Sequence, residues 1–296
     1  MFDKENKRII AKIEFKGPNL IKGIQFDGLR SLGNVRDFAL KYYNENIDEI
    51  IFHDCTASLY NQKPKFELIE KYIENLFIPV TVGGGIRNLD DVKKMFDIGA
   101  DKIAINTAAI HDPNIIFESA RIFGSQSVVA SVDLYREVIN ENEQDEFFIT
   151  HLYTLNGKEK SYVNYKEYLK KISENGAGEI LLNVINKDGT GDGCDIKLIN
   201  EIKSLSNVPI IYSGGVGKID HIKELFSKSK IDAVALSSVL HYFYYDKFKR
   251  QKQLSLRLNN NHDYGNYDFF HDGYGGQKFY NTDKLSIKEI KDKLFT

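Results

Sequence analysis

The chain has 296 residues, enough for one large α/β barrel or for two ordinary domains. An apolar content of 42% is sufficient for a packed core and excludes disorder over most of the length. The formal charge of −2 gives no electrostatic basis for binding nucleic acid. No apolar run approaches the roughly 18 residues of a membrane span, and no secretory apolar region follows the charged start. We therefore expect a cytoplasmic protein that binds neither nucleic acid nor membrane.

Strand-like segments alternate with amphipathic helices along the whole chain. The predicted strands are residues 8–15, 49–54, 80–82, 102–106, 127–133, 179–183, 210–212 and 233–236. One predicted helix is 91–98, with Asp90 as its candidate N-cap. Eight strands alternating with helices predict a single (β/α)₈ barrel over residues 1–296, with its active site at the C-terminal ends of the strands.

An internal repeat supports this architecture. Residues 79–86 recur as residues 209–216, each copy being an apolar strand followed by glycines, and the similarity ends at Asn106-Thr107 against Ser237-Ser238. Glycines after a strand let backbone N–H groups approach an anion, and the next helix adds its dipole. The repeat predicts two half-barrels and two phosphate sites, hence a small molecule with a phosphate at each end.

Two segments depart from the alternation. Residues 134–161 are polar and predict a short hairpin or loop on the catalytic face. Residues 244–283 form an insertion before a closing helix at 285–295, and we interpret it either as a surface loop or as a lid or partner-docking surface. The second interpretation rests on aromatic residues: Tyr264, Tyr267, Phe269, Phe270, Tyr274, Phe279 and Tyr280.

Six segments together resemble a known family. They are residues 8–11, 54–58, 81–87, 123–126, 188–193 and 213–215, in this order. They resemble the cyclase subunit of imidazole glycerol phosphate synthase, the barrel partner of a glutaminase in histidine biosynthesis. The resemblance covers about residues 7–243 and resumes at 286–295. It implies that ammonia from a glutaminase enters at the bottom of the barrel and reaches a substrate at the top.

The resemblance also implies roles for particular residues. An ammonia gate at the bottom would comprise Arg8, Glu49, Lys102 and Glu179, the alternative being ordinary charge at strand ends. Asp101 and Gln126 match positions near the glutaminase-facing end. The acid/base pair would be Glu14 and Asp133. Residues implied to hold phosphate or substrate are Lys22, Gly84, Gly85, Asn106, Thr107, Asp188, Gly189, Thr190, Gly214, Gly215, Ser237 and Ser238.

The upper lumen departs from the family pattern. Glu14 replaces the usual aspartate, and Lys12 replaces a small thiol. His53 stands at an inward position that is usually apolar, where we favour a buried core histidine over a base or ligand. A buried lysine is costly without a carboxylate. We therefore predict that Lys12 pairs with Glu14 or Asp133 in the lumen, unless a register slip turns it outward.

Two functions follow from this pattern. In the first, the chain is an ammonia conduit that works with a glutaminase subunit and a separate ATP-dependent amidating ligase, as relatives do in bacterial surface-sugar pathways. In the second, it is a genuine cyclase of histidine biosynthesis that acts on the bisphosphorylated ribulosyl aminoimidazole intermediate. Cys55 and Cys194 stand alone, and no His/Asp/Glu cluster has metal-ligand spacing, so we predict no metal and no cofactor.

Overall fold

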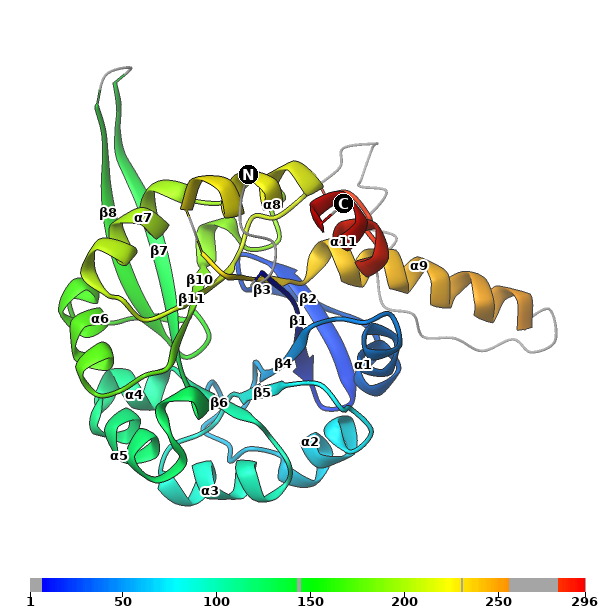
Figure 1. Ribbon diagram of the computed structural model, residues 1–296, viewed down its shortest axis with the longest axis horizontal. Helices are drawn as coiled ribbons and strands as arrows, with labels where there is room; N and C mark the ends of the chain where they lie inside the picture. The colour runs from blue at the N-terminus through cyan, green and yellow to red at the C-terminus, as the bar shows by residue number, and fades with distance from the viewer. Residues whose placement is uncertain (1–6, 143–144, 230, 256–281, 296) are drawn as a thin grey trace.

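A closed barrel of eight parallel strands forms the centre of the computed structural model, which describes residues 7–142, 145–229, 231–255 and 282–295 (Figure 1). The barrel strands are β1 (Arg8–Lys16), β4 (Glu49–Asp54), β5 (Val80–Gly83), β6 (Lys102–Ile105), β7 (Val128–Asn142), β10 (Glu179–Val184), β11 (Ile210–Ser213) and β12 (Ala233–Leu236). Strand β12 pairs with β1, and β7 pairs with β10, so the sheet closes on itself. The predicted (β/α)₈ fold is confirmed.

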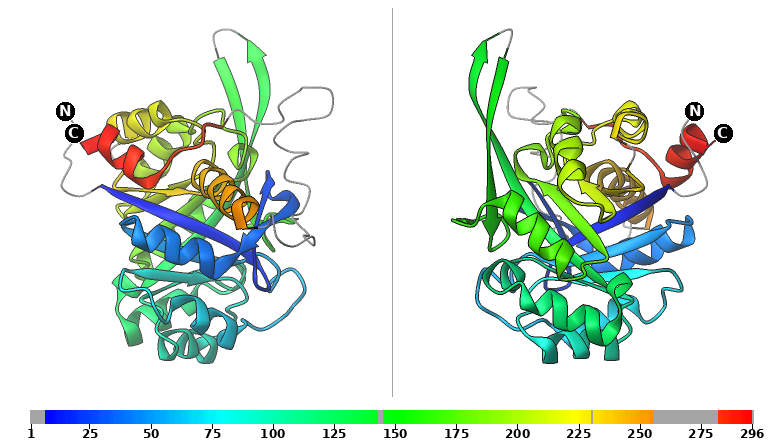
Figure 2. Two further views of the ribbon diagram at one scale, coloured as in Figure 1. Left: turned by 90° about the vertical axis from the view of Figure 1, so that its right-hand side faces the viewer. Right: turned by 60° about the vertical axis from the view of Figure 1, so that its left-hand side comes forward.

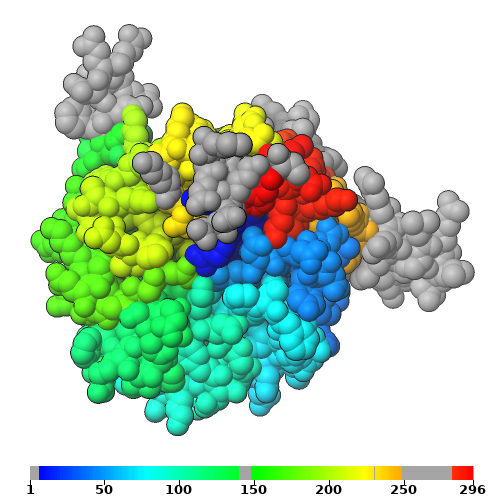
Figure 3. All heavy atoms as spheres, in the orientation of Figure 1, coloured from blue at the N-terminus to red at the C-terminus, as the bar shows by residue number. Residues whose placement is uncertain are grey.

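Helices surround the barrel, and in the space-filling view the segments follow one another round the molecule in chain order (Figure 3). They are α1 (Val35–Asn44), α2 (Phe66–Ile73), α3 (Leu89–Asp97), α4 (Thr107–His111), α5 (Asn114–Phe123), α6 (Tyr165–Glu174), α7 (Ile196–Leu205), α8 (Ile219–Ser229), α9 (Ser238–Ser255) and α11 (Ile287–Phe295), with 3-10 turns η1 (Ser125–Ser127) and η2 (Ile185–Lys187). The predicted Asp90 cap is wrong. Asn88 caps α3, because its Oδ1 accepts a hydrogen bond from the Asp91 N–H at 2.9 Å.

Alternation along the strands produces two separate cores. Ile9, Ala11 and Ile13 of β1 are buried against the helices, as the sequence predicts. Ile10 points to the opposite side and belongs to an apolar group inside the barrel. This register places the even-numbered residues of β1, including Lys12 and Glu14, in the lumen.

Two hairpins extend the barrel. Strands β2 (Asn19–Ile24) and β3 (Asp27–Asn34) follow β1 as an antiparallel pair, which the sequence analysis did not predict. Strand β7 continues past the barrel and pairs with β8 (Asp145–Thr154), which pairs in turn with β9 (Glu159–Lys160). The predicted hairpin at 134–161 is confirmed, and it projects well beyond the barrel (Figure 2).

The predicted insertion at 244–283 begins inside a helix. Residues 244–255 continue α9, which extends away from the barrel (Figure 1). The loop prediction is therefore wrong for this part. The seven aromatic residues between positions 264 and 280 lie outside the described residues. Within the described ranges, no helix combines the length and the apolar character that a membrane crossing requires.

Candidate active site and lumen

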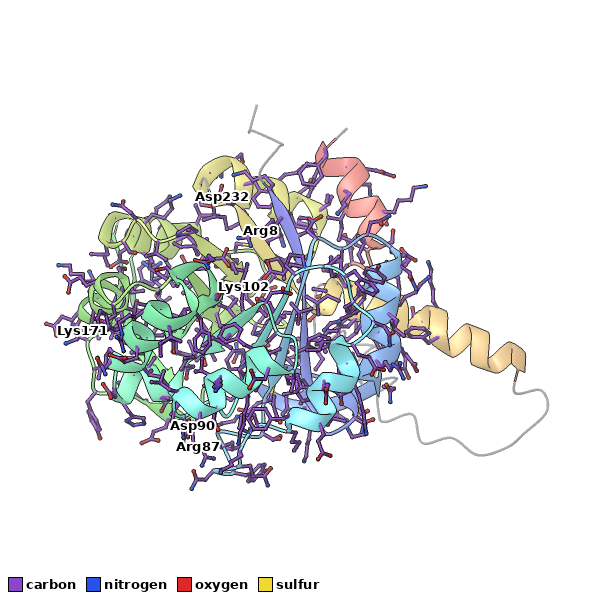
Figure 4. All side chains as sticks on the ribbon, turned by 60° about the horizontal axis from the view of Figure 1, so that its bottom comes forward. Arg8, Arg87, Asp90, Lys102, Lys171 and Asp232 are labelled. Atoms are coloured by element: carbon purple, nitrogen blue, oxygen red, sulfur yellow. The ribbon has the colours of Figure 1, made fainter. Side chains whose placement is uncertain are left out.

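Four charged side chains close the bottom of the barrel, and we call them the basal ring. Arg8 forms a salt bridge with Glu49 at 2.8 Å and a second one with Glu179. Lys102 forms salt bridges with the same two carboxylates, Glu49 at 3.1 Å and Glu179 at 2.7 Å. Arg8 and Lys102 lie close together on β1 and β6 in Figure 4. Each cation thus contacts both anions, an arrangement that offsets the cost of removing four charges from water.

The strand starts position this ring. All four residues are the first residues of their strands, so their side chains converge where the parallel strands begin. Glu49 is only 1% exposed, and it accepts a further hydrogen bond from the Thr81 hydroxyl at 2.7 Å. The ring is therefore a specific network and not a set of unrelated charges at strand ends.

An apolar section of the lumen lies above the basal ring. Its members share inward positions on the barrel strands and are fully or almost fully buried. They are Ile10, Ile51, Ala104, Val129, Leu181, Ile211, Ala233 and Ala235. Three of the eight are alanines, which leave more room than the branched residues facing them. A neutral small molecule enters such a section without the large desolvation penalty that a charged one would incur.

Charges return at the top of the lumen, in what we call the upper cluster: Lys12, Glu14, Lys22 and Asp188. The Lys12 ammonium lies 3.1 Å from Glu14 Oε1, which confirms the predicted pairing. Lys22, carried by β2, binds Glu14 Oε2 at 3.1 Å and Asp188 Oδ2 at 2.7 Å. Both oxygens of Glu14 are therefore occupied by ammonium groups.

These contacts determine the protonation state of Glu14. Burial alone raises the pKa of its carboxyl group, but the attraction of Lys12 and Lys22 outweighs burial and holds the pKa well below its usual range. The side chain is therefore ionised at neutral pH. A carboxylate in this state has no proton to donate and is a weak base.

Asp133, the other predicted acid/base residue, is in a different environment. It lies at the upper end of the barrel portion of β7, and the Asn183 amide donates a hydrogen bond to its Oδ1 at 2.7 Å. Burial raises the pKa of Asp133 to about 6, although the Asn183 hydrogen bond lowers it. A carboxyl group with a pKa near neutrality can both donate and accept a proton.

The pKa of Asp133 predicts a specific dependence of stability on pH. The folded-state pKa of about 6 lies above the ordinary value of about 3.9, so the folded state holds a proton that the unfolded state has lost. The stability that this proton contributes is complete below about pH 4 and is lost as pH rises through about 6. Relative to Asp133→Asn, the wild type should lose on the order of 2–3 kcal/mol across this interval.

Urea unfolding followed by circular dichroism at a series of pH values measures this difference. Because Glu14 titrates in both proteins, subtracting the two curves isolates Asp133. The exposed carboxylate variant Asp90→Asn is the control for loss of one negative charge. Parallel curves for the wild type and Asp133→Asn would contradict the assigned pKa.

Two pockets flank the upper cluster, and each is lined by the glycine turn of one copy of the repeat. The first pocket is lined by Gly84, Gly85, Asn106, Thr107, His53, Asp54, Ser58, Ile86, Ala104, Ile105, Asp133 and Asn156. The second pocket is lined by Gly214, Gly215, Ser237, Ser238, Asp188, Gly189, Ser213, Val216, Ala235 and Leu236. The structure thus brings the predicted phosphate residues of each copy together.

Glycine is required where the chain turns beside each pocket. Gly84 has φ +101°, and a Cβ added there would lie 2.4 Å from the Asp54 carbonyl oxygen. Gly214 has φ +127°, and its Cβ would lie 2.9 Å from the Val184 carbonyl oxygen. Side chains are therefore excluded on both steric and conformational grounds.

Comparison with known proteins identifies the family to which the chain belongs. Residues 8–246 match the family described as histidine biosynthesis protein. An imidazole glycerol phosphate synthase subunit HisF from Methanocaldococcus jannaschii is 39% identical over 268 residues, covering 85% of this chain and 98% of the relative. One from Legionella pneumophila is 43% identical over 215 residues, covering 73% and 98%. The chain belongs to the histidine biosynthesis protein family, and its relatives are of the HisF type.

Three other predicted positions of this HisF-type chain differ in their surroundings. Asp101, directly before β6, accepts a hydrogen bond from the Val80 N–H at 2.8 Å, and exposed Gln126 precedes β7 in η1. Both lie at the end of the barrel that carries the basal ring. Thr190 is not among the residues that line either pocket, and its hydroxyl donates to the Lys187 carbonyl oxygen at 2.9 Å.

Asn156, which was not predicted as a site residue, lines the first pocket of this HisF-type barrel. It lies in the turn between β8 and β9, where Leu155, Asn156 and Gly157 all have positive φ. The Leu155 N–H donates to the Thr107 hydroxyl at 3.1 Å, which fixes the turn against the pocket. An Asn-Gly pair between two strand-like runs is the signal that could have predicted the turn, although not the pocket it meets.

Two histidines, His241 and His53, lie beside the upper lumen. His241 is buried, and its ring nitrogens contact the Tyr42 hydroxyl at 2.6 Å and the Lys12 carbonyl oxygen at 3.0 Å, so it packs in the core. His53 has a buried Nδ1 without a hydrogen-bond partner among the described residues. It is therefore not the satisfied core histidine that the sequence favoured.

Proposed function

We propose that this chain is the barrel subunit of a glutamine amidotransferase that supplies ammonia for amidation of a surface-sugar precursor. The observation that carries the proposal is the occupation of both Glu14 oxygens by Lys12 and Lys22, at 3.1 Å each. Ring closure with Glu14 as an acid or base needs a carboxyl group that can exchange a proton. The contacts with Lys12 and Lys22 keep Glu14 ionised and so withhold that proton, while the lower lumen keeps the features suited to ammonia passage.

The lower barrel supports the route of the ammonia. A glutaminase subunit of the HisH type would bind at the end that carries Asp101, Gln126 and the basal ring. Displacement of Lys102 from Glu49 and Glu179 would open the floor, and neutral ammonia would cross the apolar section. The positive Lys12 ammonium above this section disfavours a cationic form of the same molecule.

The acceptor and further partners rest on the resemblance to relatives in surface-sugar pathways. There, a separate ATP-dependent ligase would activate the sugar, and the barrel would deliver the nucleophile. We propose the cytoplasm as the location, in keeping with free cysteines at positions 55 and 194. The two pockets would position a phosphorylated ligand at the top of the barrel.

A cyclase assay tests the proposal. Purified chain with an ammonium salt and the bisphosphorylated ribulosyl aminoimidazole intermediate should turn over at least about 100-fold more slowly than a HisF cyclase, because a lost acid/base group costs about 10²–10⁴ in rate. Lys12→Cys frees Glu14 Oε1 and should raise the rate. Lys12→Met, which removes the charge but keeps the bulk, distinguishes charge from space. Turnover by the wild type at a normal cyclase rate would overturn the proposal.

A second candidate is a genuine cyclase of histidine biosynthesis. It is favoured by the two pockets, which suit a bisphosphorylated substrate, and by Asp133, whose pKa of about 6 suits general acid–base chemistry. In this case Glu14 and Asp133 would act as base and acid, and the substrate would displace Lys12 or Lys22 from Glu14. Normal turnover in the same assay is the expected result of this candidate.

A further inference from the structure

Asn183 is the central member of a chain of hydrogen bonds above the apolar section. It follows Leu181 on the inward face of β10, and its side chain is buried. Its Oδ1 accepts a hydrogen bond from the Lys12 ammonium at 2.9 Å, and its Nδ2 donates one to Asp133 Oδ1 at 2.7 Å. The amide therefore connects a cation of β1 to a carboxyl group of β7.

This chain of hydrogen bonds crosses the barrel. Round the closed sheet the strands follow the order β1, β4, β5, β6, β7, β10, β11 and β12, so β7 lies opposite β1. An ammonium group has only donors and an ionised carboxylate has only acceptors, so the Asn183 amide has one favourable orientation, with Oδ1 toward Lys12 and Nδ2 toward Asp133. A second hydrogen bond from Nδ2, to the Ser131 hydroxyl at 3.2 Å, holds the side chain in place.

The position of Asn183 separates two groups of opposite charge. Lys12 forms its salt bridge with Glu14, and the Asn183 amide lies between its ammonium and Asp133. Burial raises the pKa of Asp133, while the Asn183 hydrogen bond and the Lys12 charge lower it. The other charged or titratable groups that act on Asp133 or lie beside it are Glu14, Asp188, His53 and Tyr168. Burial lowers the pKa of His53 to about 4, so its ring is neutral at pH 7.

We propose that Asn183 is a positioning residue that acts through Asp133. Its amide fixes the Asp133 carboxyl group beside the first pocket and prevents a direct ion pair with Lys12, so that Asp133 can exchange a proton with a ligand in that pocket. A direct ion pair would leave Asp133 in the same condition as Glu14, whose carboxylate is held ionised by ammonium groups. The proton exchange rests on the proposed binding of a ligand in the first pocket, whereas the positioning does not.

Nuclear magnetic resonance titration of the intact chain labelled with ¹³C-aspartate tests this role. The Asp133 carboxyl signal is identified by its absence in Asp133→Asn. Asn183→Ala removes the amide and leaves space, so Lys12 should approach Asp133 and lower its pKa by at least about one unit. Asn183→Leu fills the same space with an apolar group, so loss of the hydrogen bond should raise the pKa by about one unit. Combining Asn183→Ala with Lys12→Met should abolish the fall.

Asn207→Ala, at an exposed position before β11, is the matched control and should leave the pKa of Asp133 unchanged. Opposite shifts in Asn183→Ala and Asn183→Leu support the inference. A rise in both variants would mean that Asn183 supplies a hydrogen bond but no separation, and this result or an unchanged pKa in both overturns it. Asn183→Ser also leaves space and replaces Asn183→Ala if circular dichroism shows that the latter does not fold. The titration involves no ligand, glutaminase or acceptor, so its failure is distinct from that of the cyclase assay, which decides the proposed function.

Discussion

Replacement of Glu14 by Gln should lower the free energy of unfolding by about 3–5 kcal/mol, the usual cost of breaking a buried ion pair from one side. Glu14 is 4% exposed and is the shared partner of Lys12 and Lys22. In the variant, Lys12 keeps its hydrogen bond to the Asn183 amide oxygen, at 2.9 Å, and its contact with the Phe26 ring. Lys22 keeps Asp188. Urea unfolding at pH 7, followed by circular dichroism because the chain has no tryptophan, measures the loss.

Two comparisons sharpen this prediction. Glu14→Asp retains the charge and should lose less stability than Glu14→Gln. Because the folded-state pKa of Glu14 is lowered, its contribution is present above the ordinary pKa of about 4.3 and is lost as pH falls. The stability difference between wild type and Glu14→Gln should therefore shrink in acid. A difference below about 1 kcal/mol at pH 7 would mean that the contacts of Lys12 and Lys22 with Glu14 contribute little to stability.

Opening the basal ring should affect product formation from glutamine and product formation from external ammonium differently. Lys102→Ala removes a cation that bonds both Glu49 and Glu179, and charged hydrogen bonds of this kind contribute about 1.5–3 kcal/mol. With the floor permanently open, ammonia from the glutaminase leaks back to solvent, so glutamine-dependent product formation in the complex should fall by about tenfold or more. Ammonium-dependent formation should change little, because external ammonia reaches the top without crossing the floor. Both rates are measured on the same preparation.

The matched control is Lys93→Ala, which removes an exposed lysine from α3 on the outside of the barrel. It should leave both rates close to wild type. Equal losses with glutamine and with ammonium in Lys102→Ala would argue that the ring stabilises the barrel and does not control entry. The same logic applies to Glu179→Ala.

The barrel could be predicted because its signals are local. Each strand is a short apolar run between turns, and the alternation in β1 assigned Ile9 and Lys12 to opposite sides. The pairing of Lys12 with Glu14 followed from the cost of an unpaired buried lysine. These inferences needed only the periodicity of the chain and the chemistry of the side chains.

The remaining features depend on contacts between distant segments. Lys22 reaches Glu14 only because β2 folds back along β1. The tight turn at Gln25 and Phe26 has positive φ values, which these residue types do not predict. Asn156 reaches the first pocket because the β8–β9 turn docks on Thr107. No local pattern indicates that a turn more than 40 positions away will meet that hydroxyl group.

The half-barrel repeat described above has a consequence for the direction in which a ligand can bind. The glycine turns of the two pockets are duplicated, but their neighbours are not. The first pocket adjoins Asp133 and the neutral His53, whereas the second adjoins Asp188, which is paired with Lys22. Under the proposed function, a molecule with a phosphate at each end would therefore meet two equivalent anchors and an unequal middle. The scaffold is symmetric, yet such a ligand would have one preferred orientation.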